Sequence, residues 1–173
     1  MKLFATSVPV VVTLLAACGR PADAGRLATI DSLITVTDSL TLLVNAIDLT
    51  AYRRMDSMHR AETPTIEAQL ADTTLDREVL VHMGNYHRAM DRSLGRVMKN
   101  TEKIRKELAY TRDQLGALRH DAAKGLLPEV PEQTYMEQER LAVRQLSNGV
   151  DVLVTSAATA RREWDNYHVP PEP

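Results

Sequence analysis

The sequence is poor in cysteine and in aromatic residues. Of its 173 residues, one is cysteine, one is tryptophan and one is phenylalanine, and aromatic residues make up 4% of the chain. A single cysteine excludes an internal disulfide and any metal site built from several thiolates. Because aromatic side chains are scarce, the core must come mainly from Leu, Val, Ile, Ala and Met, a composition that suits helix packing better than a sheet.

The chain also lacks a strong excess of either charge, and it lacks the common catalytic motifs. Lys and Arg number 21 against 23 Asp and Glu, a balance too near neutral to indicate a nucleic-acid-binding protein. The sequence contains no G-x-S-x-G, no glycine-rich phosphate loop, no H-E-x-x-H and no C-x-x-C. We therefore expect neither an enzyme nor a bound cofactor.

The N-terminus has the layout of a secretory signal. One positive charge at Lys2 precedes an apolar stretch over residues 3–17, which ends in small residues immediately before Cys18. This stretch is shorter than the roughly 20 residues that a helix needs to cross the hydrocarbon core of a membrane. Cleavage after the apolar stretch is therefore favoured over an uncleaved anchor.

The residues at the expected cleavage site, Leu15-Ala16-Ala17-Cys18, resemble the lipobox of bacterial lipoproteins. The resemblance covers residues 1–19. It implies a signal peptide at 1–17, acyl chains such as palmitate on Cys18, and a short tether over 18–25. Several acyl chains would hold the protein durably on a membrane, and Gly19 in place of aspartate favours the outer membrane, facing the periplasm. Plain secretion with a free thiol at Cys18 is the other alternative.

Apolar residues recur in steps of three and four over three segments, at about 26–61, 73–122 and 132–167. Pro64 is expected to end the first helix, with a turn centred near residue 69, and Thr73 or Thr74 to cap the second. The pattern predicts an all-α protein, an elongated antiparallel three-helix bundle with coiled-coil-like long helices over 26–168, followed by a flexible tail at 169–173. A break of the third helix at 147–149 is the alternative there.

The second segment has the longest apolar stripe, and we expect that stripe to be buried. Gly84, Gly95 and Gly116 lie in the same segment outside the stripe, and each indicates either a close helix contact or a kink. The stripe consists of Val79, Met83, Tyr86, Met90, Leu94, Val97, Thr101, Ile104, Leu108, Thr111, Leu115, Leu118 and Ala122.

Methionine and histidine gather where the predicted helices meet at one end. With the turn near residue 69, position 59 lies opposite about 79, and the third helix brings Trp164, Tyr167 and position 168 to the same end. Thioether and imidazole together suit Cu(I), whereas packing at a bundle end is the simpler explanation. His87 and Asp91, four residues apart, fit a surface pair as well as a ligand pair. The candidate metal ligands are Met55, Met58, His59, His82, Met83, His87, Met90 and His168.

Two functions follow from these observations. The first is a non-enzymatic helical scaffold or adaptor in the cell envelope, held on the membrane through Cys18 and binding another protein or a second copy of itself. The alternative is a periplasmic copper-binding protein that uses the methionine and histidine cluster. Neither function involves nucleic acid.

Overall fold

The computed structural model describes residues 23–126 and 129–168. The predicted signal peptide, Cys18, most of the tether and the tail lie outside these ranges. The all-α class is confirmed, since the described residues contain helices and no strand. The elements are α1 (Ala24–Asn45), α2 (Leu49–Leu70), α3 (Arg77–Ala89), the π-helical segment η1 (Met90–Leu94), α4 (Gly95–Ala123) and α5 (Glu129–His168).

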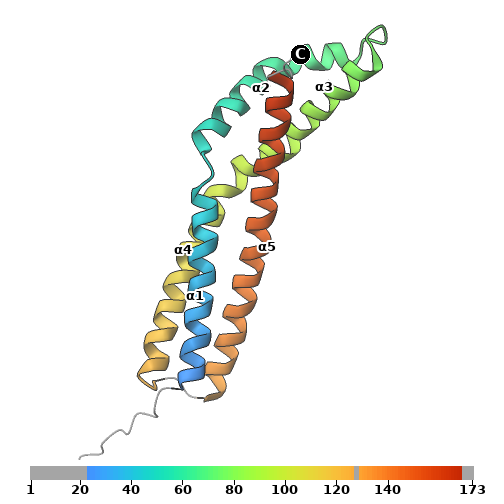
Figure 1. The fold of residues 1–173 in the computed structure, drawn as a ribbon. Helices are drawn as coiled ribbons and strands as arrows, with labels where there is room; N and C mark the ends of the chain where they lie inside the picture. Colours follow the sequence, from blue (N-terminus) through green and yellow to red (C-terminus); the bar gives the residue numbers. More distant parts are fainter. Residues whose placement is uncertain (1–22, 127–128, 169–173) are drawn as a thin grey trace, which may run out of the picture.

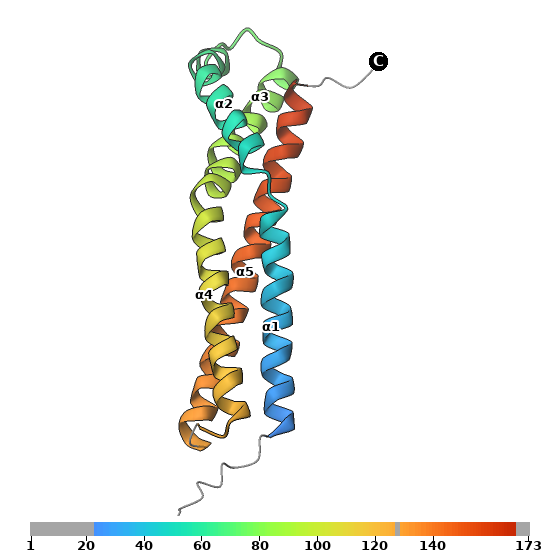
Figure 2. The same ribbon diagram turned by 90° about the vertical axis from the view of Figure 1, so that its left-hand side faces the viewer.

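The helices form a long rod (Figures 1 and 2). The chain rises through α1 and then α2, returns through α3, η1 and α4, and rises again through α5. One half of the rod consists of α1, α4 and the first part of α5, and the other half of α2, α3 and the end of α5. The start of α1 and the end of α5 therefore lie at opposite ends of the rod.

The first predicted helix is in fact two helices, which corrects the expected count of three. Residues 46–48 separate α1 from α2. The Asp48 carboxylate caps α2 by accepting hydrogen bonds from the backbone N–H groups of Thr50 at 3.0 Å and Ala51 at 3.1 Å. The apolar spacing continues through this break, so periodicity alone did not reveal it.

Pro64 does not end the helix, contrary to the sequence-based expectation. It lies within α2, which continues to Leu70. Proline removes one intrahelical N–H donor. The Thr63 hydroxyl adds a hydrogen bond within the same helix by donating to the His59 carbonyl at 2.7 Å. The cap of α3 is Asp76 rather than Thr73 or Thr74, because its carboxylate accepts from the Glu78 N–H at 2.7 Å. The turn therefore lies over 71–76, later than predicted.

The second predicted helix corresponds to α3, η1 and α4, which follow one another without a gap from Arg77 to Ala123. Every residue of the predicted stripe is buried except Val79, which is exposed near the start of α3. The run ends at Gly125, whose φ of 63° is a conformation that glycine adopts readily. A Cβ atom added at Gly95 or Gly116 would have no neighbour within 4 Å, so close helix contact does not explain these two glycines.

The third predicted helix is α5, which passes through 147–149 without a break. Gly149 lies against the core there, since a Cβ at this position would stand 3.8 Å from the Cδ1 atom of Ile104. Ile104 itself belongs to a central cluster shared by α1, α4 and α5, with Val44, Leu108 and Val150. Packing on α4 accounts for the continuity of α5 despite a sequence that favours turns.

By length and composition alone, α1 could cross a membrane. In the structure it packs on α4 and α5 instead, and it buries Ile30, Leu40 and Val44. Its two aspartates form ion pairs with α4, Asp31 with Arg119 and Asp38 with Arg112. These contacts are those of a helix packed within a bundle.

Candidate functional site

The end of the rod where α2, α3 and α5 meet collects most of the histidines and methionines singled out in the sequence. Met55, Met83 and Met90 are buried in one apolar cluster together with Tyr86 and Ile66. Met58 differs from them, because 39% of its surface is exposed. The predicted convergence of the three chain segments is therefore observed, whereas metal binding by these side chains stays a prediction.

His59 and His87 are in direct contact across this cluster. The Nε2 atom of His59 lies 3.2 Å from the Nδ1 atom of His87, and the edge of the His59 ring meets the Tyr86 ring at a centroid distance of 5.7 Å. His59 is only 5% exposed. Desolvation lowers the pKa of His59 below its ordinary value, so the neutral imidazole, which keeps a lone pair, is favoured.

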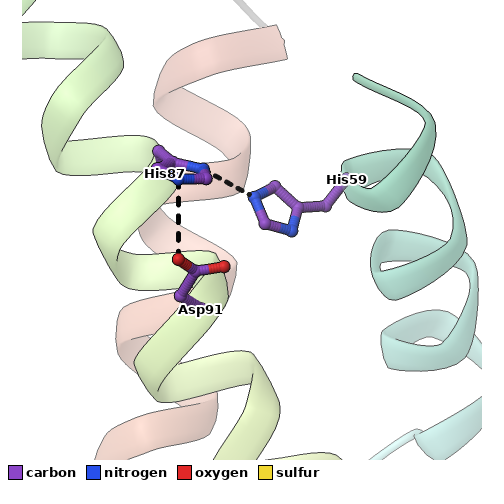
Figure 3. A group of neighbouring side chains, drawn as sticks. All are labelled: His59, His87 and Asp91. Atoms are coloured by element: carbon purple, nitrogen blue, oxygen red, sulfur yellow. Dashed lines mark hydrogen bonds and ion pairs between the residues drawn. The ribbon is translucent and has the colours of Figure 1, made fainter. Parts of the chain in front are cut away.

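His87 faces a second partner with its other ring nitrogen. Its Nε2 atom lies 3.5 Å from a carboxylate oxygen of Asp91, one turn further along the chain. Figure 3 shows His87 between His59 of α2 and Asp91 of η1, with a different nitrogen directed to each. A proton on Nε2 would serve Asp91, and the lone pair on Nδ1 would then face His59.

A second polar network joins the same helices. The Tyr86 hydroxyl donates to one oxygen of Glu62 at 2.9 Å, and the other oxygen lies 3.1 Å from Nε2 of His168. The Nδ1 atom of His168 lies 3.1 Å from the Trp164 carbonyl. Both partners of His168 are hydrogen-bond acceptors. The sequence did not single out Glu62, although its spacing of three from His59 puts both on one helix face.

Aromatic and imidazole rings at the end of α5 stack on one another and on rings of α3. Tyr86 and Tyr167 stack with centroids 4.0 Å apart and an interplanar angle of 3°. Trp164 and His168 stack at 3.9 Å, and His82 lies over the Tyr167 ring at 6.0 Å. Burial and desolvation raise the pKa of Tyr86 far above its usual range, with a further contribution from Glu62. Tyr86 therefore remains a protonated donor.

These contacts separate the predicted metal ligands into side chains whose positions are explained by packing and a pair that could bind an ion. Packing and hydrogen bonding account for His82, His168 and the three buried methionines. The pair His59 and His87 differs, because together with Asp91 it forms a group of ligand atoms that all lie within 4.8 Å of one another. An open groove on the surface of α2 and α3 reaches both His87 and Asp91.

Comparison with known proteins adds no family to this description. No family model, curated protein or solved structure matches the chain. We therefore infer the function from the residues and their geometry.

Proposed function

We propose that this protein is a lipid-anchored protein of the bacterial cell envelope that acts as a non-enzymatic helical scaffold or adaptor. It binds another protein or a second copy of itself. The pattern at Cys18 supports the anchor. In this proposal the helices pack as an elongated antiparallel three-helix bundle with coiled-coil-like packing. Such a bundle has long exposed helix faces that a partner can bind.

One surface feature carries the binding part of the proposal. Where α1 gives way to α2, an open groove against α5 is lined mainly by apolar side chains, among them Ile47, Tyr52 and Val154. Leu43 lines it as well, and the adjacent Leu42 is 72% exposed. Contiguous exposed apolar side chains mark interaction sites on proteins whose own core is already packed. Ile47 and Val44 are buried in that core nearby.

The order of the elements gives this surface a position relative to the membrane. Cys18 precedes α1, whose first residues lie at one end of the rod together with the turn between α4 and α5. The 40 residues of α5 span about 60 Å at 1.5 Å per residue. In the proposed arrangement, the apolar groove lies between the two ends of the rod. The end that contains His59, His87 and His168, here called the histidine-rich end, lies farthest from the lipid.

Site-specific photo-cross-linking tests this function. A photoreactive amino acid replaces Leu42 in the full-length protein in its native membrane, and the same group at exposed Lys99 of α4 serves as the control. We expect one discrete adduct at position 42, none at 99, and loss of that adduct when Leu43→Asp is added. The adduct mass separates self-association from a different partner. No adduct at 42, or equal adducts at both positions, would contradict the proposal.

The alternative, metal handling by the methionine and histidine cluster, retains one specific supporting observation, the contact between His59 and His87.

A further inference from the structure

We propose that His59, His87 and Asp91 form a binding site for a divalent transition-metal ion of the Zn²⁺ type. This inference goes beyond the scaffold function and does not depend on it. It also differs from the Cu(I) site that the sequence suggested, because its donors are two imidazoles, with a carboxylate as their support, rather than thioethers. Such donors suit Zn²⁺, Cu²⁺ and Ni²⁺, whereas Cu(I) selects sulfur.

The spacing of the two imidazole nitrogens fits an ion. Zinc holds histidine nitrogen at about 2.0–2.1 Å, so two such nitrogens on a tetrahedral ion stand about 3.3–3.4 Å apart. The observed separation of His59 Nε2 and His87 Nδ1 is 3.2 Å. A small rotation of the two rings would direct both lone pairs to one point. The alternative for the same geometry is a hydrogen bond between two neutral imidazoles.

Asp91 supplies the support that metal-bound histidines commonly have. A ligating histidine usually donates its second N–H to a carboxylate or carbonyl, which sets the tautomer and the ring orientation. The Nε2 atom of His87 faces the Asp91 carboxylate at 3.5 Å, which leaves Nδ1 for the ion. Asp91 lies in the π-helical segment η1, and π-helical turns within α-helices are frequent at functional sites.

Burial keeps the His59 imidazole neutral, and carboxylates lie near it. Three carboxylates act on its imidazole, those of Asp91, Glu62 and Asp56, against the single neighbouring imidazole of His87. His59 is buried, and a buried imidazole is most stable in the neutral form that binds metal. Arginines 77, 88 and 92 line the same groove as His87 and Asp91.

The groove that reaches His87 and Asp91 lets an ion reach the site and leaves room for its remaining ligands. His87 and Asp91 both line this groove, which is open to solvent and measures about 740 Å³. Two imidazoles leave the remaining positions of a tetrahedral ion free for water. The site is therefore of the open kind, which an exchangeable ion can enter.

Zinc titration of the full-length chain in detergent tests the site. The chain carries Cys18→Ser so that a free thiol contributes nothing. We expect saturable binding of one Zn²⁺ by calorimetry and a rise in Tm with added Zn²⁺. His87→Gln should abolish both effects, and Asp91→Asn should weaken binding about 10–100-fold, as loss of a supporting group does. His82→Gln is the matched control on α3 and should bind like the parent.

A spectroscopic readout keeps the test decisive if a variant folds poorly. Co²⁺ replaces Zn²⁺ in the parent, and intense d–d absorption together with perturbed ring signals of His59 and His87 in NMR would support the site. The absence of Zn²⁺ binding by the parent, or binding that His87→Gln retains, would overturn the proposal. Equal loss in His82→Gln would also overturn it, and the His59–His87 contact would then be a hydrogen bond alone.

Discussion

Arg105 of α4 donates a hydrogen bond to the backbone carbonyl of Val44 in the last turn of α1, with an Nη2-to-oxygen distance of 3.3 Å. The same nitrogen lies 3.4 Å from the carbonyl of Ile47, within the break between α1 and α2. The last carbonyls of a helix have no intrahelical partner. One side chain from a distant helix therefore adds to the backbone hydrogen bonds that these carbonyls accept from the N–H groups of Ile47 and Leu49 where the first helical segment is interrupted.

Replacement of Arg105 by alanine should remove one of the two donors to each of these carbonyls. We expect Arg105→Ala to lower the free energy of unfolding by about 0.5–1.5 kcal/mol, the net contribution of a typical hydrogen bond. Urea denaturation of the full-length chain in detergent measures it. Lys103→Ala removes an exposed ion pair with Glu107 on the same helix and should change stability by less than about 0.5 kcal/mol. Equal effects of the two substitutions would show that Arg105 does not stabilise the break.

Replacement of Ile104 by aspartate tests the apolar stripe of α4. Ile104 is 8% exposed and packs in the central cluster, so Ile104→Asp would bury an unpaired charge and should lower the free energy of unfolding by several kcal/mol, about 3–5. Val152→Asp is the matched control, because Val152 is exposed on α5. A melting temperature that Ile104→Asp leaves unchanged would contradict the observed packing.

Tyr86 should stabilise the histidine-rich end through its hydroxyl as well as its ring. Tyr86→Phe keeps the stack on Tyr167 but removes the hydrogen bond to Glu62. We expect a loss of about 1–3 kcal/mol, because the acceptor is a carboxylate. Tyr110→Phe, which removes an exposed hydroxyl that accepts from Gln114, should be nearly neutral in the same thermal melt. A neutral Tyr86→Phe would mean that water replaces the hydroxyl without loss.

Glu139 of α5 should make stability depend on pH. Desolvation raises the pKa of its carboxyl above the ordinary 4.5, and its Oε2 atom is buried without a partner in the described part of the chain. The folded chain then binds more protons than the unfolded chain above pH 4.5, so stability falls as pH rises through that window.

The substitution Glu139→Gln should therefore raise stability at pH 7 and lose its advantage below pH 4.5. Partial exposure screens the charge, so the gain should be less than about 1 kcal/mol. Unfolding curves at pH 4 and pH 7 measure the difference. Glu137→Gln, at an exposed position nearby, should show no such pH dependence. A gain of equal size at both pH values would rule out ionisation of Glu139 as the cause.

The anchor is tested at Cys18, which lies outside the described residues. We expect Cys18→Ser to release the protein from membranes or to leave the signal peptide attached, because the thiol that would receive the lipid is absent. Membrane fractionation and intact mass of the native protein measure this. An unmodified Cys18 on the membrane-bound native protein would contradict the prediction.

Helical periodicity in the sequence was enough to predict the all-α class and the buried face of the longest helical run. Residues such as Leu94, Ile104 and Leu115 recur with the helical period, and all three are buried. This succeeds because the period of the helix depends only on local backbone geometry, and burial of an apolar stripe follows from it. The convergence of His168 on the end of the bundle that holds Tyr86 was likewise predicted, and the two rings are in contact there, since α4 ends and α5 begins near the expected positions.

The place where the first segment breaks and the identity of the histidines that meet could not be predicted from local sequence. At the break, the Val44 carbonyl accepts a hydrogen bond from Arg105, which lies far along the chain. The pairing of His59 with His87, rather than with a residue near 79, depends on α2 continuing through Pro64 to a turn over 71–76. Local propensity predicts a helix end at proline. Two contacts support the longer helix: Ile66 is buried in the same apolar cluster as Met83 and Tyr86, and the Thr63 hydroxyl donates to the His59 carbonyl. Contacts between residues distant in sequence outweigh local preference here, because burial and hydrogen bonding at this end stabilise the helix more than one lost backbone donor destabilises it.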